Sequence, residues 1–260
     1  MHHYKWLAIE TSTDTLSIAV ADSHGETTQV WTFTGEGGAQ ASHNLLPAIA
    51  DLMEAAQIRL ADLTAVVFGK GPGSFTGLRT ACAVAQGLAF GAGIAVLPID
   101  TLLAVAEDAR VRDALPSLGH ASTQTHRYVV AMDARMDQVY SAAYVWQPPQ
   151  AANLAHWQCV QPPAVHAPED MAMPADWQGL RVVCAGNAGK LLAGRWPDAC
   201  THSVLAAMPT AEALLRLAPA AWLQGLALPP EEALPVYIRD KVAQTTQERA
   251  LQQLAKAMVL

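Results

Sequence analysis

The sequence predicts an α/β fold made of two lobes, and three observations support this class. Apolar strand-like runs alternate with helical patterns, which is typical of helices packed on sheets. The two halves of the chain share one order, strands followed by helix, strand and helix, although the residues do not repeat. The composition, 52% hydrophobic and 15% charged over 260 residues, supports a large core and excludes a disordered chain.

Charge and cysteine usage limit the classes of function. The net charge of −7 excludes a strongly basic nucleic-acid surface, so contact with RNA needs a local patch or a basic partner. No apolar stretch is long enough for a membrane span or a signal peptide, and we expect a cytoplasmic protein without membrane contact. Cys82, Cys159, Cys184 and Cys200 form no C-x-x-C pair, and we expect reduced, mostly buried thiols.

Short strands open the chain. The runs "KWLAIETS", "TLSIAVAD" and "TTQVWTF", with a turn signal at Gly25, predict a meander of hairpins. Residues 42–56 then change to helical spacing, with apolar residues on one face. Because Pro47 lies inside this pattern, the helix either begins near Leu46 or bends there.

A strand, a glycine loop and a helix follow. "LTAVVFG" predicts a buried strand, and residues 75–93 predict a helix whose many small residues permit close approach by a neighbour. "IAVLPID" predicts the next strand. Residues 101–110 predict the next helix, with Thr101 as its N-cap.

A second lobe is expected to begin near residue 110. Tyr128–Met132 and Gln138–Trp146 are strand-like runs, joined by a tight turn through residues 133–135. From residue 147 to 179 we expect loops with one strand around Trp157.

The last part of the chain repeats the strand, glycine turn and helix over residues 179–194. "TAEALLRLAPAAWL" predicts another helix, with Thr210 as its cap and a break or kink at Pro219. Residues 234–245 predict an extended arm, and residues 247–260 can form an amphipathic helix.

The glycine loop "GKGPGSFTG" lies where a helix N-terminus presents backbone N–H groups to an anion. Three specific patterns fail there. No lysine follows the last glycine, Ser74 stands where the dinucleotide pattern needs glycine, and Pro72 stands where a nucleophile elbow needs glycine. The sequence therefore favours a structural turn in which Gly71 and Gly73 supply backbone angles. Ser74 or Thr76 then caps the helix, and anion binding is the alternative. The residues that would contact an anion or nucleotide are Gly71, Gly73, Ser74, Phe75, Thr76 and Arg79.

Charged residues at element ends are further candidates. Glu10, Asp100 and Asp133 each suit a general base or a water-mediated magnesium ligand, and equally suit surface turns. Arg79 suits either an anion clamp or a surface salt bridge. His43 lacks a second histidine one turn on, so the sequence predicts neither a metal pair nor a set of catalytic residues.

Five stretches, taken in order, resemble one family. They are "LAIETSTDTLSIAV", "SHNLLPAIADLM", "VVFGKGPGSFTGLRTACAVAQGLAFG", "AMDARMDQVYSAAY" and "PVYIRDKVAQT". The set is similar to the TsaB family, also called YeaZ, and covers nearly the whole chain. Its most specific motif is "GPGSFTGLR".

The resemblance implies the two-lobed actin/Hsp70/sugar-kinase fold (ASKHA, RNase H-like), each lobe a mixed sheet flanked by helices. We expect an N-terminal lobe over residues 1–108, with 218–260 packing back on it, and a second lobe over 109–217.

The resemblance also implies a subunit that has no catalytic activity alone. A TsaD-like partner requires such a subunit for threonylcarbamoyl transfer to the adenosine beside the anticodon of tRNAs that read ANN codons. A TsaE-like ATPase joins the complex, and tRNA contact comes mainly through the complex. No cofactor is expected on this chain, since ATP/ADP and a metal belong to the partner subunits.

The family's pairing surface, used for homodimers or for the TsaD-like partner, corresponds to helices 42–56 and 76–91. Apolar residues on the first helix and small residues on the second fit close packing, and we expect their exposed positions to face a partner. The expected interface residues are His43, Leu46, Ile49, Met53, Ala81, Ala85 and Ala89.

Two other functions are alternatives: a glycoprotease-like (M22-type) hydrolase and an independent nucleotide-binding protein of the same fold. The missing histidine pair and the lack of a recognisable nucleophile argue against the hydrolase. Glu10 stands where family members often carry aspartate, and its extra methylene would crowd a phosphate-bound magnesium ion.

Overall fold

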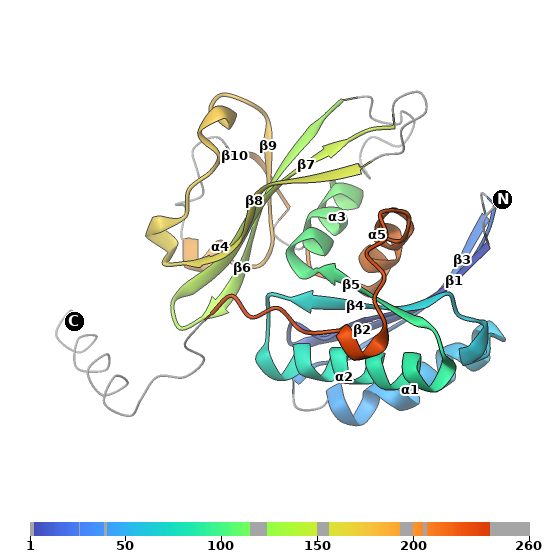
Figure 1. Cartoon of the computed structure of the whole chain (residues 1–260). Helices are drawn as coiled ribbons and strands as arrows, with labels where there is room; N and C mark the ends of the chain where they lie inside the picture. The colour runs from blue at the N-terminus through green and yellow to red at the C-terminus, as the bar shows by residue number, and fades with distance from the viewer. Residues whose placement is uncertain are drawn as a thin grey trace, which may run out of the picture.

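The computed structural model describes residues 3–25, 27–38, 41–114, 124–149, 156–192, 200–204 and 207–239. These residues form two five-stranded sheets, each mixed and flanked by helices (Figure 1). The predicted two-lobed α/β architecture is confirmed. Among the described helices, none combines the length and apolar character that a membrane crossing requires.

The first sheet has the strand order β3-β2-β1-β4-β5. Its strands are β1 (His3–Glu10), β2 (Thr15–His24), β3 (Thr27–Glu36), β4 (Ala65–Gly71) and β5 (Ala95–Asp100). β1 to β3 form the predicted antiparallel meander, whereas β4 and β5 run parallel to β1.

Helices cover both faces of this sheet. α1 (Ala41–Ala56) and α2 (Phe75–Ala92) pack on one face, while α3 (Thr101–Ala114) and α5 (Ala211–Leu223) pack on the other. Strand alternation explains the two cores that result: Leu7 and Ile9 point toward α1 and α2, whereas Trp6 and Ala8 point toward α5.

The second sheet repeats this topology, with the strand order β10-β9-β6-β7-β8. Its strands are β6 (His126–Arg135), β7 (Gln138–Gln147), β8 (His156–His166), β9 (Val182–Ala185) and β10 (Cys200–Val204). Again three antiparallel strands precede two parallel ones, so the predicted likeness of the two halves is topological.

The remaining helices among the described residues are short. They are α4 (Gly189–Leu192) and the 3₁₀ turns Leu60–Asp62, Pro168–Asp170, Ala175–Trp177 and Pro230–Glu232. α3 and α5 lie between the two sheets in Figure 1, and α3 contacts strands of both. The division into lobes at residues 108 and 217 stays a prediction; α3 and α5 run across these two positions.

Two helix boundaries differ from the sequence prediction. α1 begins at Ala41 and continues through Pro47, so a start near Leu46 is wrong. α5 likewise continues through Pro219, so a break there is wrong. Thr210 caps α5 as predicted, because its Oγ1 accepts a hydrogen bond from Ala213 N.

Two further details also differ. Asp100, not Thr101, caps α3, since its Oδ1 accepts hydrogen bonds from Leu102 N and Leu103 N. The β6–β7 turn lies beyond Ala134, with left-handed backbone at residues 135–137. The strand predicted near Trp157 is confirmed as β8, whereas β10 was not predicted.

The thiol expectation holds only in part. Cys82 is a buried free thiol, but Cys159 is exposed and Cys184 is disulfide-bonded, so a fully reduced set is wrong. The arm has no regular secondary structure over residues 233–239, and the predicted helix over 247–260 lies outside the described residues.

Candidate functional site

The glycine loop packs against the segment that follows β1. Gly71 has a φ of +114°, and a Cβ there would meet Val236 O at 2.6 Å. Gly73 needs no left-handed backbone; instead a Cβ there would come within 2.5 Å of Ser12 Cβ. The predicted turn is therefore confirmed, but the two glycines serve different purposes, backbone angle and close approach.

Hydrogen bonds fix this loop. Ser74 N donates to Ser12 O at 2.7 Å, and Thr11 Oγ1 donates to Gly77 O at 2.7 Å. Ser74 Oγ accepts from Gly77 N at 3.4 Å, so Ser74 caps α2 as predicted. The loop and the start of α2 are thus held to the end of β1.

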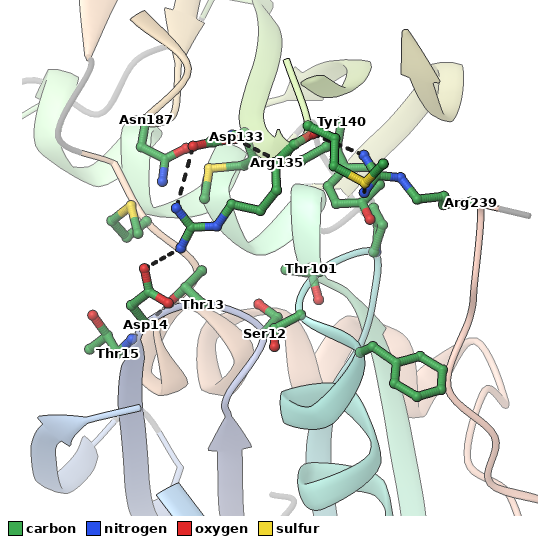
Figure 2. Close-up of a pocket in the computed structure, with 18 residues that line it drawn as sticks. Ser12, Thr13, Asp14, Thr15, Thr101, Asp133, Arg135, Tyr140, Asn187 and Arg239 are labelled. Atoms are coloured by element: carbon green, nitrogen blue, oxygen red, sulfur yellow. Dashed lines mark hydrogen bonds and ion pairs between the residues drawn. The ribbon is translucent and has the colours of Figure 1, made fainter. Parts of the chain in front are cut away.

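A cleft of about 410 Å³ lies between the lobes. The first lobe supplies the turn after β1, the glycine loop and the start of α3; the second lobe supplies the β6–β7 turn and the segment before α4. The cleft includes Ser12, whose buried Oγ has no hydrogen-bond partner among the described residues. Figure 2 shows the side chains of both lobes facing one another.

An ion pair joins the two sides of the cleft. Arg135 Nη2 donates to Asp14 Oδ2 at 2.5 Å, and both side chains are exposed (Figure 2). The second-lobe turn is ordered by Asp133, whose Oδ1 accepts from Arg135 N at 2.6 Å and whose N donates to Asn187 Oδ1 at 2.8 Å. Asp14 and Asn187 were not predicted as site residues.

The C-terminal arm also connects the lobes. Val236 N donates to Lys70 O at 2.7 Å in the first lobe. In the second lobe, Arg239 Nη2 donates to Arg135 O at 3.1 Å and to Gln138 Oε1 at 2.8 Å. Arg239 lines the cleft beside Tyr140 (Figure 2). The "PVYIRD" and "DARMDQVY" stretches therefore meet, a contact that the resemblance to a family had not specified.

The three candidate acids are placed differently. Glu10 is fully buried and does not line the cleft; its Oε1 accepts from Ser12 N at 2.6 Å. Burial raises the pKa of Glu10 from 4.5 to about 7. Burial also raises the pKa of Asp100, which caps α3. Of the three, only Asp133 lines the cleft.

The predicted anion-contacting residues divide into two groups. Gly73, Ser74 and Phe75 line the cleft, whereas Gly71, Thr76 and Arg79 do not. Arg79 pairs with none of the described carboxylates, and its role as an anion clamp stays a prediction. Its guanidinium lies 3.8 Å from the Phe75 ring centroid, and its Nε donates to Tyr237 Oη at 3.0 Å. Anion binding by this loop stays a prediction.

The predicted interface residues are also divided. His43 and Leu46 are exposed, Leu46 to 53%. The other predicted interface residues are buried between the helices and the sheet, so their assignment to an outward face is wrong. These residues are Ile49, Met53, Ala81, Ala85 and Ala89. The outer face of the two helices instead presents Ala83, Gly87 and Phe90. Partner binding by this outer face stays a prediction.

Over the described residues, no group of three or more His, Cys, Asp or Glu side chains is arranged to hold a metal ion. The fold and cleft define the class of molecule: a two-lobed α/β protein with the same strand order in both lobes. The family model described as "TsaD: tRNA N6-adenosine threonylcarbamoyltransferase" matches residues 36–256.

Individual relatives narrow the class. The tRNA threonylcarbamoyladenosine biosynthesis protein TsaB of Haemophilus influenzae is 31% identical, over 93% of this chain and 96% of its own. The protein of that name from Escherichia coli is 29% identical, over 91% and 95%. YeaZ from Pseudomonas aeruginosa is 32% identical, with a TM-score of 0.75 over 90% of this chain and 99% of its own. The chain belongs to the TsaB (YeaZ) family, within the wider family that the TsaD model describes.

Proposed function

We propose that this chain is a cytoplasmic subunit of the machinery that makes threonylcarbamoyladenosine in tRNA. A TsaD-like partner carries out the threonylcarbamoyl transfer, and this chain is required for it without catalysing it alone. The observation that carries the proposal is the 31% identity over 93% of the chain to a protein named for this pathway, TsaB.

The arrangement of the cleft supports a role without catalysis of its own. Asp14 is paired with Arg135, and Asp133 accepts a hydrogen bond from the backbone of the same arginine. The Glu10 carboxyl is buried away from the cleft. We therefore assign ATP/ADP and the metal to the partner subunits, a TsaD-like protein and a TsaE-like ATPase, and tRNA contact mainly to the complex.

We assign the partner surface to the outer face of α1 and α2, defined by His43, Leu46, Ala83, Gly87 and Phe90. Leu46 and Phe90 are large apolar side chains exposed to 53% and 76%. A Cβ added at Gly87 would meet no atom within 4 Å, so packing within this chain does not explain the glycine. Because glycine weakens a helix interior by roughly 0.5–1 kcal/mol, close approach by a second helix is a physical reason for it.

Reconstitution tests the subunit role. The chain is mixed with its cognate TsaD-like and TsaE-like proteins, threonylcarbamoyl adenylate and an ANN-decoding tRNA, and threonylcarbamoyladenosine is measured by mass spectrometry. We expect product only when both this chain and the TsaD-like protein are present. Robust transfer by this chain alone would refute the non-catalytic role, and full transfer without this chain would refute the subunit role.

A variant tests the surface separately. Gly87→Arg should abolish copurification with the TsaD-like protein, and any homodimer, while the melting temperature of the free chain stays unchanged or rises. Val160→Arg, at an exposed apolar position on β8 in the other lobe, is the matched control and should leave copurification intact. Wild-type affinity in the Gly87 variant would show that the surface lies elsewhere.

A further inference from the structure

A second cavity, of about 430 Å³, shares no lining residue with the interlobe cleft. We call it the α3–α5 cavity and define it by Glu107, Arg110, Trp146, Trp157 and Arg216. Apolar residues of β5, α3 and α5 complete its wall. None of these residues has a part in the proposed subunit role, so the cavity needs its own explanation.

A buried carboxylate organises the charges in this cavity. Glu107 is 3% exposed. Its Oε1 accepts hydrogen bonds from Arg110 Nη2 at 2.7 Å and Arg216 Nε at 3.0 Å. Its Oε2 accepts from Arg110 Nε at 2.8 Å and Trp157 Nε1 at 3.1 Å. Four donors therefore occupy the carboxylate, and two guanidinium groups share one negative charge.

This arrangement leaves hydrogen-bond donors unused. Arg216 meets Glu107 only through Nε, and no described residue accepts from its two terminal nitrogens. Arg110 likewise leaves Nη1 without an acceptor among the described residues. Lys70 and Asp100 also line the cavity, and their side chains carry opposite charges. The excess charge at the two arginines is thus positive and favours an anion.

The aromatic wall adds a second preference. The Arg110 guanidinium lies 5.0 Å from the Trp146 ring centroid. Trp157 is fixed by its bond to Glu107 and by edge-on contacts with Tyr128 and Tyr144, at 5.2 and 6.4 Å between ring centroids. Flat apolar surface beside unused guanidinium donors suits a planar ring that carries a negative group.

We propose that the α3–α5 cavity is a binding site for a small aromatic anion, a ring that bears a carboxylate or a phosphate monoester. The anionic group bonds the terminal nitrogens of Arg216, and the ring packs against Trp146. Binding couples β7 and β8 of the second lobe to α5 of the first, since the cavity is lined by all three.

Calorimetric titration of the full chain tests this site with four probes. 1-Naphthyl phosphate and 1-naphthoate carry both features and distinguish a phosphate ligand from a carboxylate ligand. Inorganic phosphate lacks the ring, and 1-naphthol lacks the charge. We expect one binding site for 1-naphthyl phosphate, 1-naphthoate or both. Inorganic phosphate and 1-naphthol should each bind at least about tenfold more weakly than that aromatic anion. Equal affinity for inorganic phosphate or for 1-naphthol would overturn the proposal, as would no binding of either aromatic anion.

Two variants locate the site. Arg216→Gln should weaken the aromatic anion about tenfold, because it removes charge-assisted hydrogen bonds, while Glu107 keeps three donors and the fold survives. Trp146→Leu should weaken it through loss of the flat ring. Arg59→Gln removes an exposed arginine that pairs with Asp62 and lines neither cavity, and it should bind as wild type does. Equal weakening in the Arg59 and Arg216 variants, or no weakening in the Arg216 and Trp146 variants with unchanged melting temperatures, would place binding elsewhere.

Discussion

The buried Glu10 carboxyl should make the stability of the chain depend on pH. Its pKa is about 7 in the folded protein, against 4.5 for an ordinary glutamate, chiefly because burial disfavours the charged form. The folded state therefore holds a proton that the unfolded state releases between these two values. By linkage, stability is greatest below the unfolded pKa and falls as the pH rises through the folded pKa.

The magnitude follows from the two pKa values. At about 1.4 kcal/mol per pH unit, the rise from 4.5 to about 7 corresponds to roughly 3 kcal/mol of unfolding free energy, lost by about pH 8. No reduction for solvent screening applies, since Glu10 is 0% exposed. Glu10→Gln removes this titration while its side-chain oxygen can still accept from Ser12 N.

Urea unfolding of both proteins at pH 5 and pH 8 measures the difference. Wild type should lose about 3 kcal/mol more than Glu10→Gln over this interval. Glu54→Gln, at an exposed glutamate of α1, is the control for loss of a carboxylate and should follow wild type. Parallel pH dependence in wild type and Glu10→Gln would show that Glu10 does not hold the proton, and the reasoning from burial would fail.

Three further substitutions test the placement of residues in α1, the glycine loop and α2. Ile49→Glu should unfold the chain or lower its stability by several kcal/mol, since Ile49 is 4% exposed in the core. An unchanged thermal melt together with lost partner binding would show that Ile49 lies at the partner interface instead. Gly73→Ala should cost about 1–3 kcal/mol, because its Cβ would come within 2.5 Å of Ser12 Cβ, whereas Gly87→Ala, in open space, should be neutral or stabilising in the same denaturant titration.

Local patterns predicted the elements better than their faces. Period-two runs and the turn at Gly25 identify the meander, and small residues after Ser74 identify α2. Helical periodicity gave the wrong assignment for Ile49 and Ala85, which were predicted to contact a partner. An apolar helical face indicates burial without saying whether the sheet or a partner covers it. The sheet covers both residues. The exposed faces of α1 and α2 depend on how the two helices pack on the sheet, which the sequence pattern does not specify.

The cleft residues that the sequence did not predict were missed for a different reason. Arg239 bonds Arg135, 104 positions earlier, and Arg135 pairs with Asp14, 121 positions away. No local spacing rule reaches across such distances, so their roles depend on the topology. The N-cap of α3 was misassigned by one residue, since Asp100 and Thr101 are both suitable caps. Thr101 Oγ1 instead accepts a hydrogen bond from Gly71 N, and Asp100 caps the helix.

The repeated topology explains why the cleft forms where it does. In each lobe a parallel strand leads through a glycine into a helix: β4 through the loop at Gly73 into α2, and β9 through Gly186 into α4. Gly186 has a φ of +109° and lies against Ala131 O, as Gly73 lies against Ser12. In open α/β sheets ligand crevices form outside the carboxyl ends of such strands. Here the two strand ends face one cleft, and the Asp14–Arg135 pair joins the adjoining turns across it.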